Sequence, residues 1–195
     1  DSFGRVDLVT TTVGADQFVQ QVTYDQYSRV FQQFDASGDD RGLRYFYSNG
    51  YVSRLKEARE GLSGTVYQDI RAMDARGNVT HLLLGNGVDV YANYEPDTGK
   101  LARLSAFDAS GVELMNVDYL FDVLGNLKQR HDLSVATDLK EEFGYDTLNR
   151  LKSVNLSVNA GAAVQSLTMD YDASGNIVYK SDVGIYYYDG PQPHA

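Results

Sequence analysis

The sequence predicts an all-β protein made of stacked antiparallel β-hairpins, and three observations lead to this prediction. A short phrase recurs along the 195 residues: an aromatic residue, Asp, two variable residues, Gly, Arg or Asn, and an aliphatic residue. Ahead of the phrase, apolar residues alternate with polar ones, which is the period of a β-strand. No stretch carries a sustained helical pattern of apolar residues. A unit that recurs every 21 to 27 residues is typical of an architecture in which each repeat buries its neighbour's face.

Taken in chain order, the phrase gives about eight repeats that fill residues 1–195 as a single array. The Asp of the phrase, or its equivalent, lies at 1, 25, 48, 74, 95, 122, 146 and 172, in steps of 21 to 27 residues. The residues expected to carry the repeat structure are Asp1, Gly4, Arg5, Tyr24, Asp25, Arg29, Tyr47, Gly50, Asp74, Gly77, Asn78, Tyr94, Gly99, Phe121, Asp122, Gly125, Asn126, Tyr145, Asp146, Asn149, Arg150, Tyr171, Asp172, Gly175 and Asn176.

The copies differ in completeness. The copy at 1–6 begins after its aromatic, the copy at 47–52 is one residue short, and the copy at 94–101 is one residue long. A further partial copy begins at Tyr188. Because the chain begins in mid-motif and ends on a partial copy, we expect it to be a fragment of a longer chain.

Each phrase is expected to form a tight turn between two strands. The Asp side chain can accept a hydrogen bond from a backbone N–H two residues on, and the Gly supplies a positive φ that other residues adopt only at a cost. Asn149 stands at one Gly position and tolerates this conformation. Ser28 fits the position less well, so we expect a variant turn there.

The strands and the remaining turns follow from the pattern between the phrases. Residues 88–94 and 115–121 alternate apolar and polar side chains. A second turn phrase at 34–38 and at 107–111 leaves a strand of roughly five or six residues after the first turn. The best helical candidates, 54–60 and 137–142, are short and charged, and we interpret them as exposed strand or loop.

Composition limits the classes of function. The chain has 43% hydrophobic residues and 3 Pro, which predicts a sizeable core, and 15 Tyr suit a sheet surface. A net charge of −10 argues against a nucleic-acid partner and against an anionic membrane surface. There is no Cys, so no disulfide or thiolate chemistry is expected. No signal peptide or transmembrane run is present in this stretch.

The sequence gives no catalytic, cofactor or metal site. The adjacent acids Asp39-Asp40 and Glu141-Glu142 would point to opposite faces of a strand, so neither pair resembles a glycosidase pair. Three isolated histidines lack the spacing of metal ligands, and the Asp-rich turns lack the pattern of calcium β-rolls. Residues 61–65 are interpreted as a turn rather than a nucleophile elbow, and the glycosylation sequons at 78–80 and 155–157 as chance. The histidines are His81, His131 and His194.

The repeated Tyr and Asp residues leave two interpretations open. Aromatic residues beside carboxylates on a sheet can bind sugars. Alternatively, each motif aromatic stacks on the equivalent residue one repeat away and forms a ladder that needs no ligand, each pair adding about 0.5–1.5 kcal/mol beyond area burial. We favour the ladder.

The repeat resembles the RHS or YD repeat, whose signature runs approximately Arg-Tyr-x-Tyr-Asp-x-x-Gly-Arg-Leu. Residues 44–50 match its front half, residues 1–6 its back half, and residues 94–101 a common variant with one extra residue. The chain departs from the signature at Ser28, Ser48, Met73 and Asn149. The tail from Tyr186 to Ala195 is similar to family segments near the end of the array.

The resemblance implies a context and a function. Proteins of this kind include bacterial RHS toxins, the B and C components of Tc toxin complexes, wall-associated proteins and teneurins. Their repeats form a curved β-sheet that spirals into a hollow shell, and in the toxins the shell encloses a C-terminal toxic segment. This chain would be an open fragment of such a shell, secreted or at the cell surface, whose partners are the cargo and further repeats of the same parent chain. The family's self-cleaving protease core has no match before Ala195.

Two alternatives remain from the sequence. One is an extracellular module that binds glycans or a cell-surface protein through exposed tyrosines. The other is an enzyme on a β-solenoid scaffold, which would need carboxylates to converge in one groove. We expect no enzyme activity, no cofactor, no nucleic-acid partner and no membrane insertion by this segment.

Overall fold

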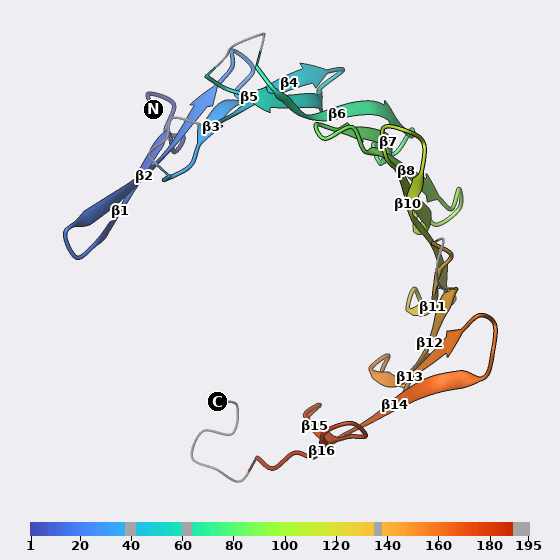
Figure 1. Cartoon of the computed structure of the whole chain (residues 1–195). Coiled ribbons are helices and arrows are strands. Elements are labelled where there is room, and N and C mark those ends of the chain that lie inside the picture. Colours follow the sequence, from blue (N-terminus) through green and yellow to red (C-terminus); the bar gives the residue numbers. More distant parts are fainter. Residues whose placement is uncertain (38–41, 60–63, 135–137, 189–195) are drawn as a thin grey trace. The chain divides into compact units, whose positions relative to one another are not determined.

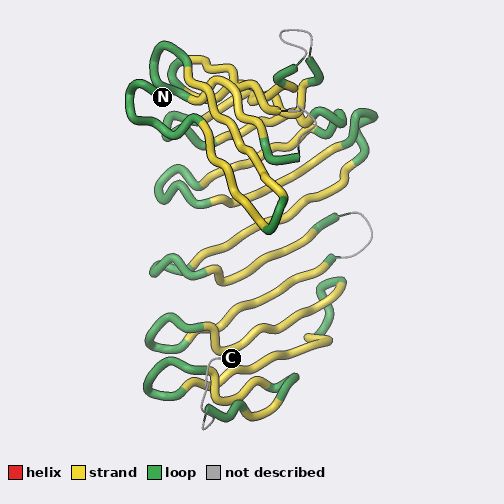
Figure 2. The backbone as a smooth tube through the Cα atoms, turned by 90° about the vertical axis from the view of Figure 1, so that its left-hand side faces the viewer, coloured by secondary structure: helices red, strands yellow, loops and turns green. Residues whose placement is uncertain are grey.

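The computed structural model describes residues 1–37, 42–59, 64–134 and 138–188. These residues contain sixteen β-strands and no helix (Figures 1 and 2). It follows that no described helix could cross a membrane. The order of the strands in the sheet is their order in the chain, from β1 to β16. The all-β fold of consecutive antiparallel strands predicted from the sequence is therefore confirmed.

The strands belong to two compact units, Asp1–Tyr91 with Asp108–Ser110, and Ala92–Phe107 with Gly111 onward. The first unit holds β1 (Leu8–Val13), β2 (Asp16–Tyr24), β3 (Val30–Phe34), β4 (Gly42–Ser48), β5 (Tyr51–Glu57), β6 (Val66–Met73), β7 (Val79–Leu84) and the start of β8 (Asp89–Tyr94). The second holds the end of β8, β9 (Leu101–Phe107), β10 (Glu113–Phe121), β11 (Leu127–Asp132), β12 (Leu139–Tyr145), β13 (Leu151–Val158), β14 (Ala163–Tyr171), β15 (Ile177–Lys180) and β16 (Gly184–Ile185).

Each motif turn joins two antiparallel strands, and the same irregularity occurs beside it. In the β2–β3 hairpin, Tyr24 opposes Val30 while Thr23 opposes Gln32, so Phe31 is an extra residue. The register shifts at the same motif position in five further hairpins, where the residue is Tyr47, Met73, Phe121, Tyr145 or Tyr171. Such a β-bulge bends the strand and increases its local twist. The bulge is therefore part of the repeat, and the sequence pattern did not indicate it.

The predicted alternation is present in the strands, but the expected sizeable core is not. In β8 and β10, Ala92 and Val117 are buried, whereas Tyr91 and Leu120 are exposed. Among the described residues only five apolar side chains are buried, and none of the large ones is fully so. The expectation of a large core was wrong because a single sheet, without a second layer, covers neither of its faces. The buried apolar residues are Ala58, Ala92, Ala106, Val117 and Met169.

The two charged segments considered for helices are strands where the structure describes them. Residues 54–57 belong to β5 and residues 139–142 to β12. The interpretation of these segments as strand is confirmed, and their expected exposure is confirmed in part, since Arg54 and Glu142 are exposed but Lys56 and Lys140 are half-buried. Several predictions fall outside the described residues: Gly38, Asp39, Asp40, Glu60, Gly61 to Ser63, Thr137, and the tail from Asp189 to Ala195 with His194.

Candidate functional site

The repeated turn is the one constellation that recurs throughout the chain, and five hydrogen bonds close it. In the turn between β14 and β15, the Asp172 N–H donates to the Asn176 carbonyl at 2.9 Å, and the Gly175 N–H donates to the Asp172 carbonyl at 3.1 Å. Asp172 Oδ1 accepts the N–H groups of Ser174 and Asn176, both at 2.9 Å. Asp172 Oδ2 accepts Asn176 Nδ2 at 3.0 Å. Asp172 is thus a partner in each of the five hydrogen bonds that close this turn.

The same bonding recurs at the turns 25–29, 74–78, 122–126 and 146–150, and at 1–5, where the amino terminus donates to the Arg5 carbonyl. The Gly position has a positive φ, for example 95° at Gly125 and 93° at Gly175. Ser28 and Asn149 adopt φ values of 63° and 61° at this position. The expected variant turn at Ser28 was therefore wrong. Ser28 accepts the left-handed conformation because the Asp25 carboxylate holds the flanking N–H groups of Tyr27 and Arg29.

The hydrogen bonds hold the turn carboxylates in their ionised form. The side-chain hydrogen bond from Asn176 is the largest influence that lowers the pKa of Asp172, and Asn126 and Asn78 act in the same way on the pKa of Asp122 and of Asp74. At Asp146 the backbone N–H of Arg150 is the first cause of the lowered pKa. A carboxylate with a lowered pKa that accepts three hydrogen bonds is a poor proton donor or acceptor at neutral pH.

The turns of the short copy at 47–52 and of the long copy at 94–101 are closed by other hydrogen bonds. Ser48 and Tyr51 pair directly across a two-residue turn in which Asn49 and Gly50 have φ values of 50° and 87°. Two positive φ values in succession are the geometry of a type I′ hairpin, for which Asn-Gly is the preferred sequence. In the long copy, the Glu95 N–H donates to the Lys100 carbonyl at 2.8 Å, and Gly99 keeps a positive φ of 71°.

The residue after the Gly position connects one repeat to the next. Arg5, Arg29 and Arg150 each donate from Nε to Oδ2 of their own turn Asp, at 2.8, 2.8 and 2.7 Å. Each guanidinium also lies over the motif ring of the following repeat. The distances from Cζ to the ring centroid are 4.1 Å to Tyr24, 4.1 Å to Tyr47 and 4.5 Å to Tyr171. Lys100 lies over Phe121 in the same way, with Nζ 5.0 Å from the ring centroid.

The motif tyrosines make a second contact with the preceding repeat. Five of these hydroxyls donate to the backbone carbonyl of the aliphatic residue that follows the Arg or Asn one repeat earlier. The pairs are Tyr24 to Val6 at 2.7 Å, Tyr47 to Val30 at 2.7 Å, Tyr145 to Leu127 at 2.9 Å, Tyr171 to Leu151 at 2.7 Å and Tyr188 to Ile177 at 2.7 Å.

These contacts replace the expected stacking of ring on ring at Tyr24, Tyr47 and Tyr171. Successive motif aromatics stand two strands apart, and neighbouring strands are ~4.8 Å apart, so the rings are about 10 Å from one another. That distance is too long for stacked rings, and the guanidinium from the intervening turn fills it. Sequence reasoning recognised the Arg position but not its contact with the next ring.

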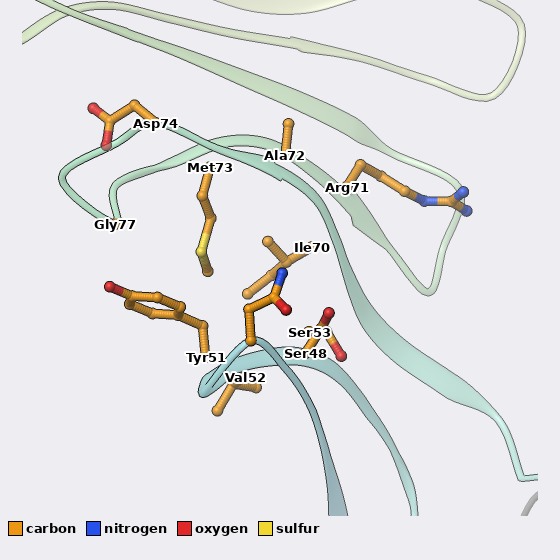
Figure 3. A pocket seen from close by; sticks show the side chains of 11 residues that line it. Ser48, Tyr51, Val52, Ser53, Ile70, Arg71, Ala72, Met73, Asp74 and Gly77 are labelled. Atoms are coloured by element: carbon orange, nitrogen blue, oxygen red, sulfur yellow. The ribbon is translucent and has the colours of Figure 1, made fainter.

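Four steps have no cation at the Arg position, where Tyr51, Asn78, Asn126 and Asn176 stand instead. A cavity lies at the step of Tyr51 and another at the step of Asn126. One cavity, of about 360 Å³, lies between the turn at 48–51 and the turn at 74–77. Tyr51 stands at the Arg position of this step, and its ring lies so close to Gly77 that a Cβ on Gly77 would be 3.1 Å from it. Figure 3 shows the Met73 side chain extending from β6 toward the space beside Tyr51, Val52 and Ile70.

The second cavity, of about 390 Å³, lies between the turn at 122–126 and the turn at 146–149. Its step has Asn126 at the Arg position and Tyr145 as the following motif aromatic. Asn126 Nδ2 donates to Asp122 Oδ2 at 3.0 Å and to Asn149 Oδ1 at 3.0 Å, so the amide stays at the level of the turns. The cavity is lined by Asp122, Leu124, Asn126, Lys128, Phe143, Tyr145, Asp146 and Asn149.

The other titratable groups considered from the sequence have separate partners. Glu141 pairs with Arg130 at 2.5 Å and Glu142 with Lys140 at 2.8 Å, so the two adjacent acids do not converge. His81 lies 2.8 Å from Asp89 and stacks on Tyr91, and His131 contacts Asp138. Within the described ranges, no group of three or more His, Cys, Asp or Glu side chains is arranged to hold a metal ion.

Comparison with known proteins identifies the fold. No protein-family model matches the sequence, and neither does any curated protein. The chain is similar to a part of the solved TcdB2–TccC3 structure, with a TM-score of 0.71 and 22% identity over 86% of this chain and 9% of that chain. It is also similar to a part of the Tc holotoxin pore of Photorhabdus luminescens, with a TM-score of 0.71 and 19% identity over 89% of this chain and 10% of that chain.

At these identities the likeness establishes the fold alone. The chain spans about a tenth of the length of the toxin chains that it matches. The fold is the one expected from the repeat, since Tc toxin components are among the proteins whose RHS repeats this sequence resembles. The RHS/YD-repeat resemblance is thereby confirmed at the level of the fold.

Proposed function

We propose that this chain is a structural segment of an RHS-type shell that encloses a toxic cargo carried by the same parent chain. The observation that carries the proposal is the repeat-to-repeat bonding. Successive hairpins are joined by strand pairing, by guanidinium groups over tyrosine rings and by tyrosine hydroxyls bonded to backbone carbonyls. The Arg and Tyr positions of the repeated phrase are therefore used to hold one repeat against the next.

Two further observations support a wall rather than an enzyme. The turn carboxylates accept hydrogen bonds from their own turn, which leaves them in a structural role. The sheet has no second layer among the described residues, so its faces are free to border a cargo on one side and solvent on the other. On this proposal the segment works by exclusion and has no catalytic activity, and it acts outside the producing cell.

A glycan-binding role receives less support. The motif tyrosines use their hydroxyls on backbone carbonyls and three of their rings on guanidinium groups. A sugar platform would have to use other tyrosines, such as Tyr27 and Tyr67, which are 69% and 42% exposed. Binding to a glycan array that disappears in Tyr27→Ser and Tyr67→Ser, with the fold retained, would favour this alternative.

Protease protection tests the shell proposal. The parent chain is digested with a nonspecific protease, and survival of its cargo is compared with that in a parent chain from which residues 1–195 have been deleted. We expect the cargo to survive in the intact parent and to be degraded in the deletion variant. The double variant Arg150→Ala, Tyr171→Leu weakens the contact between two successive repeats and is expected to give intermediate protection. Equal rates of cargo digestion in all three proteins would refute the proposal.

A further inference from the structure

The steps between repeats differ in one feature, which is whether a cation covers the next motif ring. The chain's own cation does so at the steps that end on Tyr24, Tyr47, Phe121 and Tyr171. At the step that ends on Tyr145, Asn126 replaces the Arg, and in the described part of the chain no cation lies over the Tyr145 ring. The cavity of about 390 Å³ lies at that place.

The cavity keeps the groups that hold a guanidinium at the filled steps. The Tyr145 ring remains in the position of the rings that receive Arg29 and Arg150, because its hydroxyl makes the same bond to the preceding repeat, at 2.9 Å to the Leu127 carbonyl. The Asp122 carboxylate remains at the turn, as Asp25 does beside Arg29. Each carboxylate oxygen has two lone pairs, so Asp122 Oδ2 can accept a further N–H beside that of Asn126.

The electrostatics of the cavity favour a cation. Its lining includes the carboxylates of Asp122 and Asp146 and the ammonium of Lys128. Asp146 is already paired with Arg150 at 2.7 Å, so Asp122 is the carboxylate that faces a ligand without an ion-pair partner of its own turn. Burial and, after it, the charge of Asp122 raise the pKa of the Tyr145 hydroxyl. The face of an aromatic ring next to a carboxylate attracts a guanidinium both by its quadrupole and by charge.

The cavity at the Tyr51 step is unsuited to the same ligand. There the aromatic Tyr51 itself stands at the Arg position, and the following motif residue is Met73, which has no ring (Figure 3). Ile70, Ala72 and Val52 also line this cavity. Arg71 already lines this cavity, and Asp74 supplies the one carboxylate among the residues that line it, so a second cation would gain little there.

We propose that the cavity between the 122–126 turn and Tyr145 binds the guanidinium group of an arginine side chain presented by another polypeptide segment. In the bound state the guanidinium stacks on the Tyr145 ring and donates to the Asp122 carboxylate, as Arg29 does between Asp25 and Tyr47. An arginine side chain is the ligand because the same chain places arginine at the same location in three other repeats. The inference concerns a ligand site and does not depend on whether the chain encloses a cargo.

The test uses the intact chain and N-acetyl-arginine amide, with N-acetyl-citrulline amide as the matched neutral probe. Citrulline has nearly the same shape as arginine but lacks the charge. We expect saturable changes in the backbone amide resonances of residues 122–126 and 145–150, and about five- to tenfold weaker binding of the citrulline probe. Equal binding of the two probes, or changes confined to other residues, would overturn the proposal.

Two variants make the test specific. Asn126→Arg supplies the guanidinium from the chain itself, so the arginine probe should no longer bind at this site. The amide resonances of the variant should keep the dispersion of a folded protein. Arg150→Asn removes the guanidinium over Tyr171, so a second site of similar affinity should appear at the 146–150 turn. Retained binding in Asn126→Arg, or no new site in Arg150→Asn, would contradict the assignment of the cavity as a vacant arginine position.

Discussion

At the scale of single residues, the positions of the motif differ in their physical roles. The Asp satisfies the turn's N–H groups, the Gly position supplies the left-handed φ, and the Arg contacts the following repeat. The Tyr contributes its ring to the Arg and its hydroxyl to a carbonyl. The turn and the step between repeats can therefore be weakened separately.

The tyrosine hydroxyl bond can be removed without removing the ring. Tyr171→Phe deletes the bond to the Leu151 carbonyl and should lower the free energy of unfolding by about 1 kcal/mol. Tyr171→Leu also removes the ring from Arg150 and should cost ~0.5–1 kcal/mol more. Urea titration measures both changes. Tyr187→Phe, on a side chain that is 79% exposed, is the matched control and should have little effect. A cost at Tyr171→Phe no larger than that control would show that the hydroxyl bond contributes nothing.

The turn aspartates make the free energy of unfolding depend on pH. Because hydrogen bonds lower the pKa of Asp74, Asp122, Asp146 and Asp172 below the ordinary 3.8, their stabilisation is complete above that value and is lost as the pH falls through the lowered pKa. We expect the free energy of unfolding to be nearly constant above about pH 5 and to fall below about pH 4. Asp172→Asn, which keeps an acceptor but cannot titrate, should reduce that fall. An unchanged acid dependence in this variant would argue against the carboxylate's role.

At the scale of secondary-structure elements, the motif hairpin is a bulged pair of strands that approach closely at the bulge. In the β12–β13 hairpin, Gly144 opposes Ser153, and the register shifts at the next residue. A Cβ on Gly144 would lie 2.4 Å from Ser153 Oγ but 3.7 Å from Ser153 Cβ. The hydroxyl, and not the backbone, therefore limits the size of the side chain at position 144.

A double-mutant cycle tests this close approach. Gly144→Ala alone should lower the free energy of unfolding by about 1–3 kcal/mol, because the new methyl group overlaps the hydroxyl. In a Ser153→Ala background the overlap is gone, and most of that cost should disappear. Thermal and urea unfolding of the four proteins give the coupling free energy. If Gly144→Ala costs the same in both backgrounds, the limit lies in the backbone and this interpretation of the hairpin is wrong.

At the scale of the whole molecule, the strands lie in the sheet in their chain order. The first and the last strand of that order therefore each pair with one neighbour. All six residues of β1 are exposed, and its large apolar side chains include Val9 and Val13, at 42% and 63% exposure. β1 pairs only with β2 in this order. An exposed apolar edge strand is a template for pairing with another chain.

The exposed edge strand β1 predicts that this chain associates with further copies of itself. We expect its apparent mass in sedimentation velocity to rise with protein concentration, and the double variant Val9→Lys, Val13→Lys to remove that rise. Val164→Lys, a charge on the interior strand β14 at a residue that is 65% exposed, is the control and should leave association unchanged. Association that persists in the β1 variant, or that is lost equally in the control, would place the contact elsewhere.

The sequence alone determined the parts of this protein that depend on contacts within a few residues. The period of two, the recurring Asp and the Gly position fixed strands, turns and their spacing, because a turn is closed by groups at most four residues apart. The fold class followed from repetition of that unit, and the resemblance to RHS repeats followed from the same residues. The type of turn at Ser28 was missed, since there the bonds of Asp25 outweigh the weak preference of Ser.

Only the tertiary structure decided what lies between the repeats. The guanidinium over the next tyrosine ring, the tyrosine hydroxyl on the preceding carbonyl and the bulge beside each turn all join residues that belong to different strands. Their partners depend on the register of the pairing and on the distance between strands, neither of which a single repeat encodes. The difference between Arg and Asn after the Gly position is small in the sequence. Between Arg150 and Asn126, this difference separates a filled step from an open cavity in the folded sheet.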